Sequence, residues 1–147
     1  MVVMIHRSKL EPHQDNPRKD LGDLSELSAS IARSGLLQNL TVVPHPDKEG
    51  MYRIIIGHRR FAASELAGIE ELPCVVEDMT PSEQIATMLA ENMQRNDLTL
   101  TDQVFGIQTM LDLGDTATDI AVMTGLSTTT VRRREKLAGL NFNKLKD

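Results

Sequence analysis

The sequence predicts an α+β fold, in which a mixed N-terminal part is followed by an all-α segment. Short runs rich in β-branched residues occur at residues 2–5, 41–43, 51–56 and 72–76, separated by turn formers and helical stretches. From residue 80 onward the chain shows helix starts and helical spacing instead. The 147 residues suit one domain, or a small domain with an appended module. We therefore expect a mixed domain over residues 1–98 and a helical segment over 99–147.

The composition predicts an intracellular protein with an aliphatic core. Hydrophobic residues make up 40% of the chain, but aromatic residues make up 3% and tryptophan is absent. The single cysteine, Cys74, cannot form an internal disulfide and is interpreted as an inert buried thiol. No apolar run approaches the roughly 20 residues of a membrane span, and the N-terminus lacks the apolar core of a signal peptide. We expect a soluble, cytoplasmic protein without membrane contact.

Charge is unevenly distributed along the chain. The net charge is −5, which argues against broad nucleic-acid binding. Residues 118–147, however, hold six basic and three acidic side chains, a local net charge of +3. Any DNA contact is therefore expected near the C-terminal end.

Residues 11–35 are predicted to form a loop and then a helix. The loop over 11–19 is rich in turn formers, and His13 within it is interpreted as a solvated side chain. Asp23 is the expected cap of a helix whose apolar stripe includes Leu27 and Ile31, and Gly35 is its expected end.

The stretch after the apolar run 53–56 is the strongest candidate for an anion site. Gly57 lets the backbone approach a ligand closely, and the helix that follows starts with free N–H groups. Arg59 and Arg60 add positive charge in its first turn. We interpret this stretch as a nucleotide or phosphate site, although a solvated basic helix start fits these residues equally well.

Two later stretches also carry candidate functional residues. The helix that begins after Thr80 ends with Glu91, Asn92 and Arg95, of which Glu91 and Arg95 have i, i+4 spacing. An ordinary surface ion pair is the alternative interpretation. A further helix, capped by Thr99 or Thr101, is expected to end at Gly114.

A helix-turn-helix is predicted between residues 116 and 134. Ala121, Gly125 and Val131 have its spacing, with a small packing residue, a turn glycine and an apolar anchor. A plain helical hairpin with a basic face is the alternative, and the local charge excess favours DNA binding. The expected DNA contacts are Ser127, which also caps the second helix, and Thr128, Thr129, Thr130, Arg132 and Arg133.

With these pieces placed, the chain resembles the ParB family of chromosome and plasmid partition proteins from about residue 10 to residue 140. Four of its segments resemble the family's Gln-Pro-Arg, Ser-Ile…Gly-Leu-Leu-Gln, Gly-Glu-Arg-Arg and Glu-Asn-x-Gln-Arg-x-Asp-Leu. They are, in order, Asn16-Pro17-Arg18, Ser30-Ile31 to Gly35-Leu36-Leu37-Gln38, Gly57-His58-Arg59-Arg60 and Glu91-Asn92-Met93-Gln94-Arg95-Asn96-Asp97-Leu98.

The resemblance implies a ParB/sulfiredoxin-like N-terminal domain that binds CTP with Mg2+. It also implies that the nucleotide closes a homodimer into a clamp on double-stranded DNA, that a ParA-type ATPase is a partner, and that the protein is associated with the nucleoid or a plasmid. Glu91 and Asn92 are implied as residues near the metal and the triphosphate. The nucleotide-binding residues implied by the resemblance are Arg18, Ser30, Gly35, Gln38, Gly57, Arg59, Arg60 and Arg95.

Asn16 replaces the glutamine of the first family segment, and two further departures from the family pattern bear on function. His58 stands where the family has a glutamate associated with CTP hydrolysis, so His58 is the catalytic candidate and hydrolysis is expected to be slow or absent. The chain stops at Asp147, before the family's further DNA-binding helices and its dimerisation domain, so we expect weak DNA affinity.

Three other functions are considered beside the partition hypothesis. An enzyme on the same scaffold, such as sulfiredoxin or an ATP-dependent small-molecule kinase, is one. Sulfiredoxin chemistry needs a cysteine beside the phosphate loop, where this chain has Gly57, and Cys74 belongs to a different predicted strand. A ParB-like nuclease would want a cluster of carboxylates, which the sequence does not supply. The last alternative is a structural adaptor that uses the helix-turn-helix alone.

Overall fold

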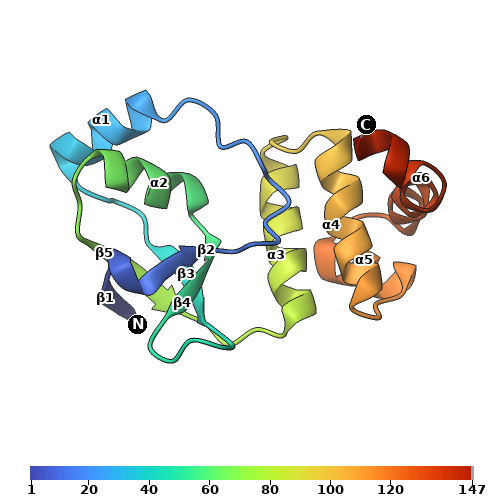
Figure 1. Ribbon diagram of the computed structural model, residues 1–147, viewed down its shortest axis with the longest axis horizontal. Helices are drawn as coiled ribbons and strands as arrows, with labels where there is room; N and C mark the ends of the chain where they lie inside the picture. The colour runs from blue at the N-terminus through green and yellow to red at the C-terminus, as the bar shows by residue number, and fades with distance from the viewer. Residues whose placement is uncertain (147) are drawn as a thin grey trace. The chain divides into compact units, whose positions relative to one another are not determined.

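The chain folds into two compact units in the computed structural model, which describes residues 1–146 and, from 138 onward, the backbone alone (Figure 1). The N-terminal unit comprises residues 1–14 and 20–78. The helical unit comprises residues 15–19 and the chain from Met79 onward. Residue 147, the end of the second predicted domain, lies outside the described residues. The predicted domain boundary after residue 98 stays a prediction, and residues 79–98 group by their contacts with the helices that follow.

A five-stranded mixed sheet forms the centre of the N-terminal unit. Its order is β1-β5-β3-β4-β2, with β1–β5 and β3–β4 antiparallel and β3–β5 and β2–β4 parallel. A mixed sheet with helices that follow it confirms the predicted α+β class. The strands are β1 (Val2–His6), β2 (Leu10–Pro12), β3 (Leu40–Pro44), β4 (Tyr52–Ile56) and β5 (Glu71–Val76).

The edge strand β2 was not predicted. It has three residues, too few for an alternating pattern to be recognised, and a short 3-10 turn over Arg7–Lys9 separates it from β1. Leu10 is nevertheless buried in the aliphatic core with Leu40, Ile54 and Leu72. Pro12 is tolerated because β2 lies at the sheet edge, where a missing N–H interrupts no central ladder.

Two helices, α1 (Ser25–Ser34) and α2 (His58–Leu66), pack against each other on the sheet (Figure 1). The predicted end of α1 is confirmed, because the Gly35 N–H donates to Ile31 O and its φ is +75°. The residue that caps α1 in the structure is Leu24, and Asp23 lies one residue before it. Asp23 Oδ1 accepts the backbone N–H of Ser25 at 2.9 Å. The predicted cap at Asp23 is therefore wrong by one residue, although Asp23 still satisfies a donor of the helix start.

The helical unit contains α3 (Pro81–Gln94), α4 (Leu100–Asp112), α5 (Ala117–Thr124) and α6 (Thr128–Lys146). Thr80 and Thr99 begin α3 and α4 with reciprocal capping boxes, which confirms Thr80 and selects Thr99 over Thr101. Thr116 begins α5 in the same way. The helices pack in the pairs α3–α4, α3–α5, α4–α6 and α5–α6. Within the described chain, no helix combines the length and apolarity that crossing a membrane requires.

Candidate functional site

The start of α2 is fixed by a glycine that no other residue could replace without strain. Gly57 follows β4 directly and has a φ of +105°, which favours glycine. A Cβ at Gly57 would lie 2.4 Å from Leu40 Cδ2, so the backbone approaches β3 closely here. The first intrahelical bond runs from Phe61 N–H to Gly57 O at 2.9 Å, which leaves the N–H groups of 58–60 at the helix start. The predicted strand–glycine–helix arrangement is therefore confirmed.

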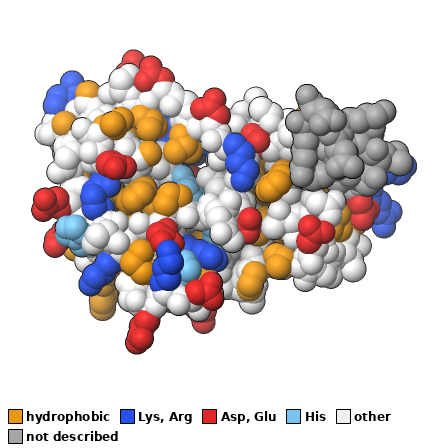
Figure 2. All heavy atoms as spheres, in the orientation of Figure 1, with side chains coloured by type: hydrophobic (Ala, Val, Ile, Leu, Met, Phe, Trp, Pro, Cys, Tyr) orange, Lys and Arg blue, Asp and Glu red, His pale blue; other side chains and the backbone are white. Residues whose placement is uncertain are grey.

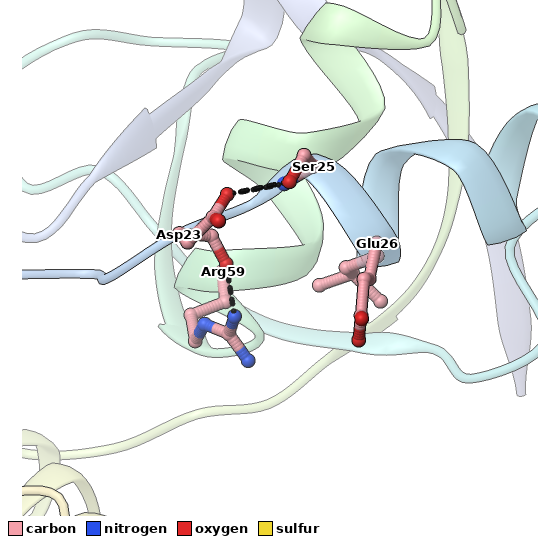
Figure 3. Close-up of a pocket in the computed structure, with 5 residues that line it drawn as sticks. Asp23, Ser25, Glu26 and Arg59 are labelled. Carbon is pink, nitrogen blue, oxygen red and sulfur yellow. Dashed lines mark hydrogen bonds between the residues drawn. The ribbon is translucent and has the colours of Figure 1, made fainter.

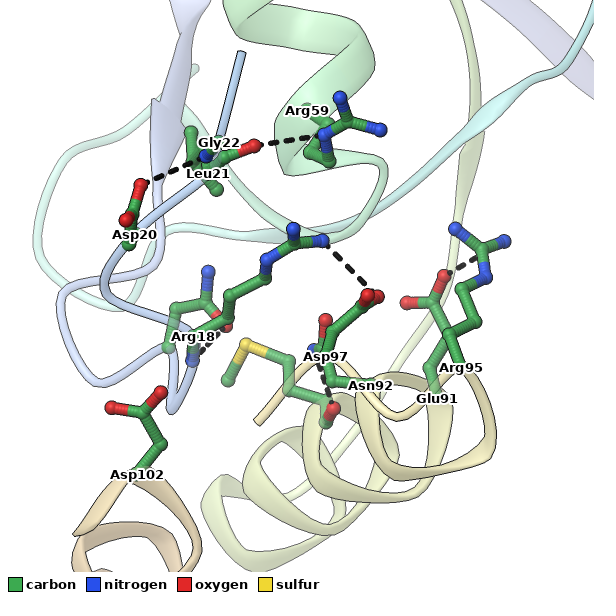
Figure 4. A network of polar contacts seen from close by, with 12 residues as sticks. Arg18, Asp20, Leu21, Gly22, Arg59, Glu91, Asn92, Arg95, Asp97 and Asp102 are labelled. Carbon is green, nitrogen blue, oxygen red and sulfur yellow. Dashed lines mark hydrogen bonds and ion pairs between the residues drawn. The ribbon is translucent and has the colours of Figure 1, made fainter. Parts of the chain in front are cut away.

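Both predicted phosphate arginines of α2 donate to backbone carbonyls. Arg59 Nε contacts Leu21 O and its Nη2 contacts Asp23 O, each at 2.9 Å. Figure 4 shows the first contact and Figure 3 the second. Arg60 Nη1 donates to Asn39 O at 2.7 Å. The two guanidinium groups thus hold the segments before α1 and before β3, and their contact with a nucleotide stays a prediction.

An open hollow of about 610 Å³ lies beside Arg59 in the N-terminal unit (Figure 3). Its lining includes Asp23, Ser25 and Glu26. The hydrogen bond from the Ser25 hydroxyl, followed by that from the Ser25 N–H, lowers the pKa of Asp23, and the charge of Arg59 contributes further. The hollow therefore presents carboxylates together with one guanidinium group.

His58 is a hydrogen-bond acceptor in the structure. Its Nε2 accepts the backbone N–H of His13 at 3.1 Å, so this nitrogen carries no proton. Burial, and then the charge of His13, lowers the pKa of His58 from 6.5 to about 4. The predicted direction is confirmed, but the cause is burial and His13 rather than the two arginines. The prediction that His13 is solvated is wrong, because His13 is buried, with 6% of its surface exposed.

The other predicted nucleotide residues of the N-terminal unit surround the end of α1. Ser30 is half-buried on α1, Gly35 ends the helix, and Gln38 is exposed in the segment that leads to β3. Their assigned contact with a nucleotide stays a prediction.

Residues 15–19 form a strap that packs on the helical unit, although the chain before and after them belongs to the N-terminal unit. Arg18 Nη1 lies 3.1 Å from Asp97 Oδ2 (Figure 4). The backbone N–H of Arg18 donates to Asn16 Oδ1 at 3.3 Å, and Asn16 is buried. Lys19 Nζ lies 4.6 Å from the ring centroid of Phe105. Arg18 is thus held by a carboxylate that the sequence did not single out.

The end of α3 carries the two residues expected near magnesium. Glu91 Oε1 lies 3.3 Å from Arg95 Nη2, which confirms the predicted i, i+4 pair (Figure 4). Asn92 Nδ2 donates to Met88 O at 2.7 Å. Carboxylate and amide oxygens are among the ligands that Mg2+ takes, and the ion completes its octahedron with water and substrate phosphates. The residues therefore suit the ion, and their binding of it stays a prediction.

The helix-turn-helix has the predicted local structure. Gly125 makes the turn with a φ of +79°, and Val131 and Ala121 are buried. Ser127 Oγ accepts the N–H of Thr130 at 3.1 Å, which confirms the predicted cap. Among the expected DNA contacts, Ser127, Thr129, Arg132 and Arg133 are exposed, and Thr128 and Thr130 are half-buried.

Basic side chains lie at the surface where α6 is found (Figure 2). Arg134, the next residue after the predicted contacts, differs from them because its Nε donates to Gln103 Oε1 on α4 at 3.0 Å. The outer face of α6 can therefore offer Arg132 and Arg133 to a polyanion, while Arg134 joins α6 to α4.

Two partners in these networks were missed by sequence reasoning, Asp97 and His13. Both lie far along the chain from the residues they contact, so neither periodicity nor local spacing could pair them. Asp97 did lie within the motif segment 91–98, and its charge opposite to that of Arg18 was the available signal.

Comparison with known proteins identifies the class to which this fold and these motifs belong. Residues 1–93 match the family model described as the ParB N-terminal domain. The chain is 36% identical over 141 residues to the chromosome-partitioning protein Spo0J of Thermus thermophilus, which covers 95% of this chain and 51% of that protein. The chain thus spans about half the length of such curated relatives.

Two solved structures of the C-terminally truncated chromosome-partitioning protein ParB from Caulobacter crescentus are also similar. The complex with CTP-gamma-S has a TM-score of 0.62 at 29% identity and covers 95% of this chain and 79% of that one. The complex with the centromeric parS site has a TM-score of 0.64 at 27% identity, over 94% of this chain and 72% of that one. The structure is thus of the class that joins a ParB N-terminal domain to a helical segment. The chain belongs to the ParB family.

Proposed function

We propose that the chain binds CTP with Mg2+ and that the nucleotide controls its binding to double-stranded DNA in chromosome or plasmid partition. The observation that carries the proposal is the strand–Gly57–helix arrangement, in which close backbone approach, helix N–H groups and two arginines meet. Membership of the ParB family and the likeness to a relative complexed with CTP-gamma-S support it.

The proposed phosphate contacts use donors that already have acceptors within the protein. Arg59 and Arg60 donate to neutral carbonyl oxygens. A phosphate oxygen adds a negative charge opposite the guanidinium group and can form a bidentate pair with it, which a single neutral carbonyl oxygen cannot. A phosphate oxygen is therefore a better acceptor than Leu21 O or Asn39 O, and the guanidinium groups would gain by exchanging partners or by sharing.

The remaining assignments complete the proposed nucleotide contacts. Ser30, Gly35 and Gln38 would contact the nucleoside or phosphates, and Arg18 and Arg95 would contact phosphates. Glu91 and Asn92 would hold Mg2+, which neutralises part of the triphosphate charge.

The proposed DNA contact is the outer face of α6. Arg132 and Arg133 are exposed there, and the helix-turn-helix geometry would place the start of α6 at the major groove. A relative complexed to parS supports this assignment. Dimerisation on nucleotide binding, association with the nucleoid or a plasmid, and a ParA-type partner ATPase complete the proposal.

Calorimetry with CTP, ATP and GTP, each with Mg2+ and with or without duplex DNA, tests the proposal. We expect CTP to bind in preference to the two purine nucleotides and Arg60→Ala to lose most of that binding. Lys48→Ala is the matched control, because Lys48 lies in the turn before β4 and pairs with Glu11 of β2, whereas Gly57 follows the other end of β4. Equal binding of all three nucleotides, or full binding by Arg60→Ala, would contradict the proposal.

Slow CTP hydrolysis is a separate part of the proposal. His58 is neutral near pH 7 and its Nε2 is occupied by the His13 N–H, so it is poorly suited to orient water or to support a cation. We expect little phosphate release from CTP by the parent chain and more by His58→Glu, at matched nucleotide saturation. Brisk turnover by the parent that is unchanged in His58→Glu would show that another residue does the chemistry.

A further inference from the structure

The ion pair between Arg18 and Asp97 joins the strap of residues 15–19 to the chain just after α3. Arg18 Nη1 and Asp97 Oδ2 are 3.1 Å apart, and the two side chains are 16% and 23% exposed. The two side chains are thus partly shielded from solvent, and part of their surface remains accessible to a ligand. Partly exposed ion pairs are weak, so a more highly charged anion can replace the carboxylate.

Asp97 occupies a position where a carboxylate depends on a cationic partner. It follows the C-terminal end of α3, and its N–H donates to Asn92 O at 2.9 Å. The carbonyl groups at a helix C-terminus repel a negative charge, so Arg18 offsets an unfavourable location. The backbone contact also keeps Asp97 next to the proposed metal residue Asn92. A triphosphate bound there would add negative charge close to Asp97.

We propose that Asp97 is a positioning residue that holds Arg18 on the helical unit and competes with nucleotide phosphate for it. Asp97 thereby sets the affinity for the nucleotide, and it lies outside the residues to which the family resemblance gives a role. The inference rests on the proposed CTP binding and deepens it. The Arg18–Asp97 pair also explains why the strap of residues 15–19 packs on the helical unit before a nucleotide binds.

Asp97→Asn keeps the side-chain shape and removes its charge. If Asp97 competes with phosphate for Arg18, this variant should hold the strap less firmly but bind CTP more tightly. Without nucleotide, Arg18 loses its carboxylate partner, so the backbone amides of the strap should exchange hydrogen for deuterium faster. With CTP and Mg2+, a phosphate no longer competes with the Asp97 carboxylate for Arg18, so the Kd for CTP should fall about two- to five-fold, the range expected for the loss of one partly exposed ion pair. A merely structural role would loosen the strap and weaken binding together.

Three further variants make the test decisive. Asp97→Glu keeps the charge and should retain nearly the parent affinity. Asp112→Asn removes one acidic charge from an exposed site at the end of α4, so it should change neither readout. Arg18→Ala should weaken CTP binding, and adding Asp97→Asn to it should then give no gain in affinity.

The outcomes separate the inference from the function on which it rests. If the parent chain binds CTP but Asp97→Asn binds it equally or less tightly, the competition is overturned and the proposed function stands. Unchanged exchange of the strap amides in Asp97→Asn also overturns the inference, since Asp97 would then not hold Arg18. A parent chain that binds no CTP overturns the proposed function and the competition together.

Discussion

Replacing Gly57 by alanine should destabilise the N-terminal unit through two separable effects. The first is backbone strain, because a φ of +105° is a conformation that residues with a Cβ rarely adopt; such strain costs about 1–3 kcal/mol. The second is steric, because the new Cβ would lie 2.4 Å from Leu40 Cδ2. Leu40 is 0% exposed and cannot move outward, so the core must repack at about 1–3 kcal/mol. The expected total loss is about 2–6 kcal/mol.

Urea unfolding followed by circular dichroism measures this loss through the free energy of unfolding. Gly50→Ala is the matched control, because Gly50 lies in the same unit with a φ of +79° and a Cβ there meets nothing within 4 Å. Gly50→Ala therefore measures the cost of backbone strain without a steric clash. We therefore expect Gly57→Ala to lose about 1–3 kcal/mol more than Gly50→Ala. Equal losses in the two variants would refute the close approach of the α2 start to Leu40.

Three further predictions follow from the described contacts. Replacing Arg132 and Arg133 by alanine should weaken duplex binding, measured by fluorescence anisotropy, and reduce the slope of log K against log salt by about 0.9 per lost phosphate contact; an unchanged slope would remove α6 from the interface. Thr99→Ala should cost about 1 kcal/mol in unfolding free energy, because Thr99 caps α4, and Thr101→Ala should cost almost nothing. The pKa of His58 is lowered from 6.5 to about 4, so neutral His58 contributes fully to the free energy of unfolding above pH 6.5. That contribution is lost as pH falls toward 4, by up to about 3 kcal/mol. The free energy of unfolding of His58→Asn should lack this pH-dependent loss.

Local chemistry made the helix starts and the turn positions predictable from the sequence. Thr80 with Glu83 three residues later identifies a capping box, because both partners lie within one turn. Gly125 and Val131 could be assigned to the helix-turn-helix for the same reason, since their spacing fixes a turn and a buried anchor. The family motifs then indicated which of these local structures carry the nucleotide assignment.

Contacts between distant parts of the chain could not be predicted in this way. His13 was interpreted as solvated because its neighbours are turn formers, yet it is buried, and its backbone N–H donates to Nε2 of His58, 45 residues further along the chain. The short strand β2 forms because its partner β4 exists, and its own three residues carry no strand signal. The strap likewise needs Asp97 and Phe105, which come from the end of α3 and from α4.

The motifs select the arginines, but the acceptors that these arginines contact in the folded chain depend on the chemistry of the guanidinium group. A guanidinium group carries five N–H donors and remains charged, so in a folded chain it takes the best acceptor within reach. Arg59 and Arg60 take carbonyl oxygens, whereas Arg18 and Arg95 take carboxylates. At these contacts a phosphate competes with a charged acceptor for Arg18 and Arg95 and with a neutral acceptor for Arg59 and Arg60. Arg60 should therefore contribute more to CTP binding than Arg18, and removal of Asp97 should narrow that difference.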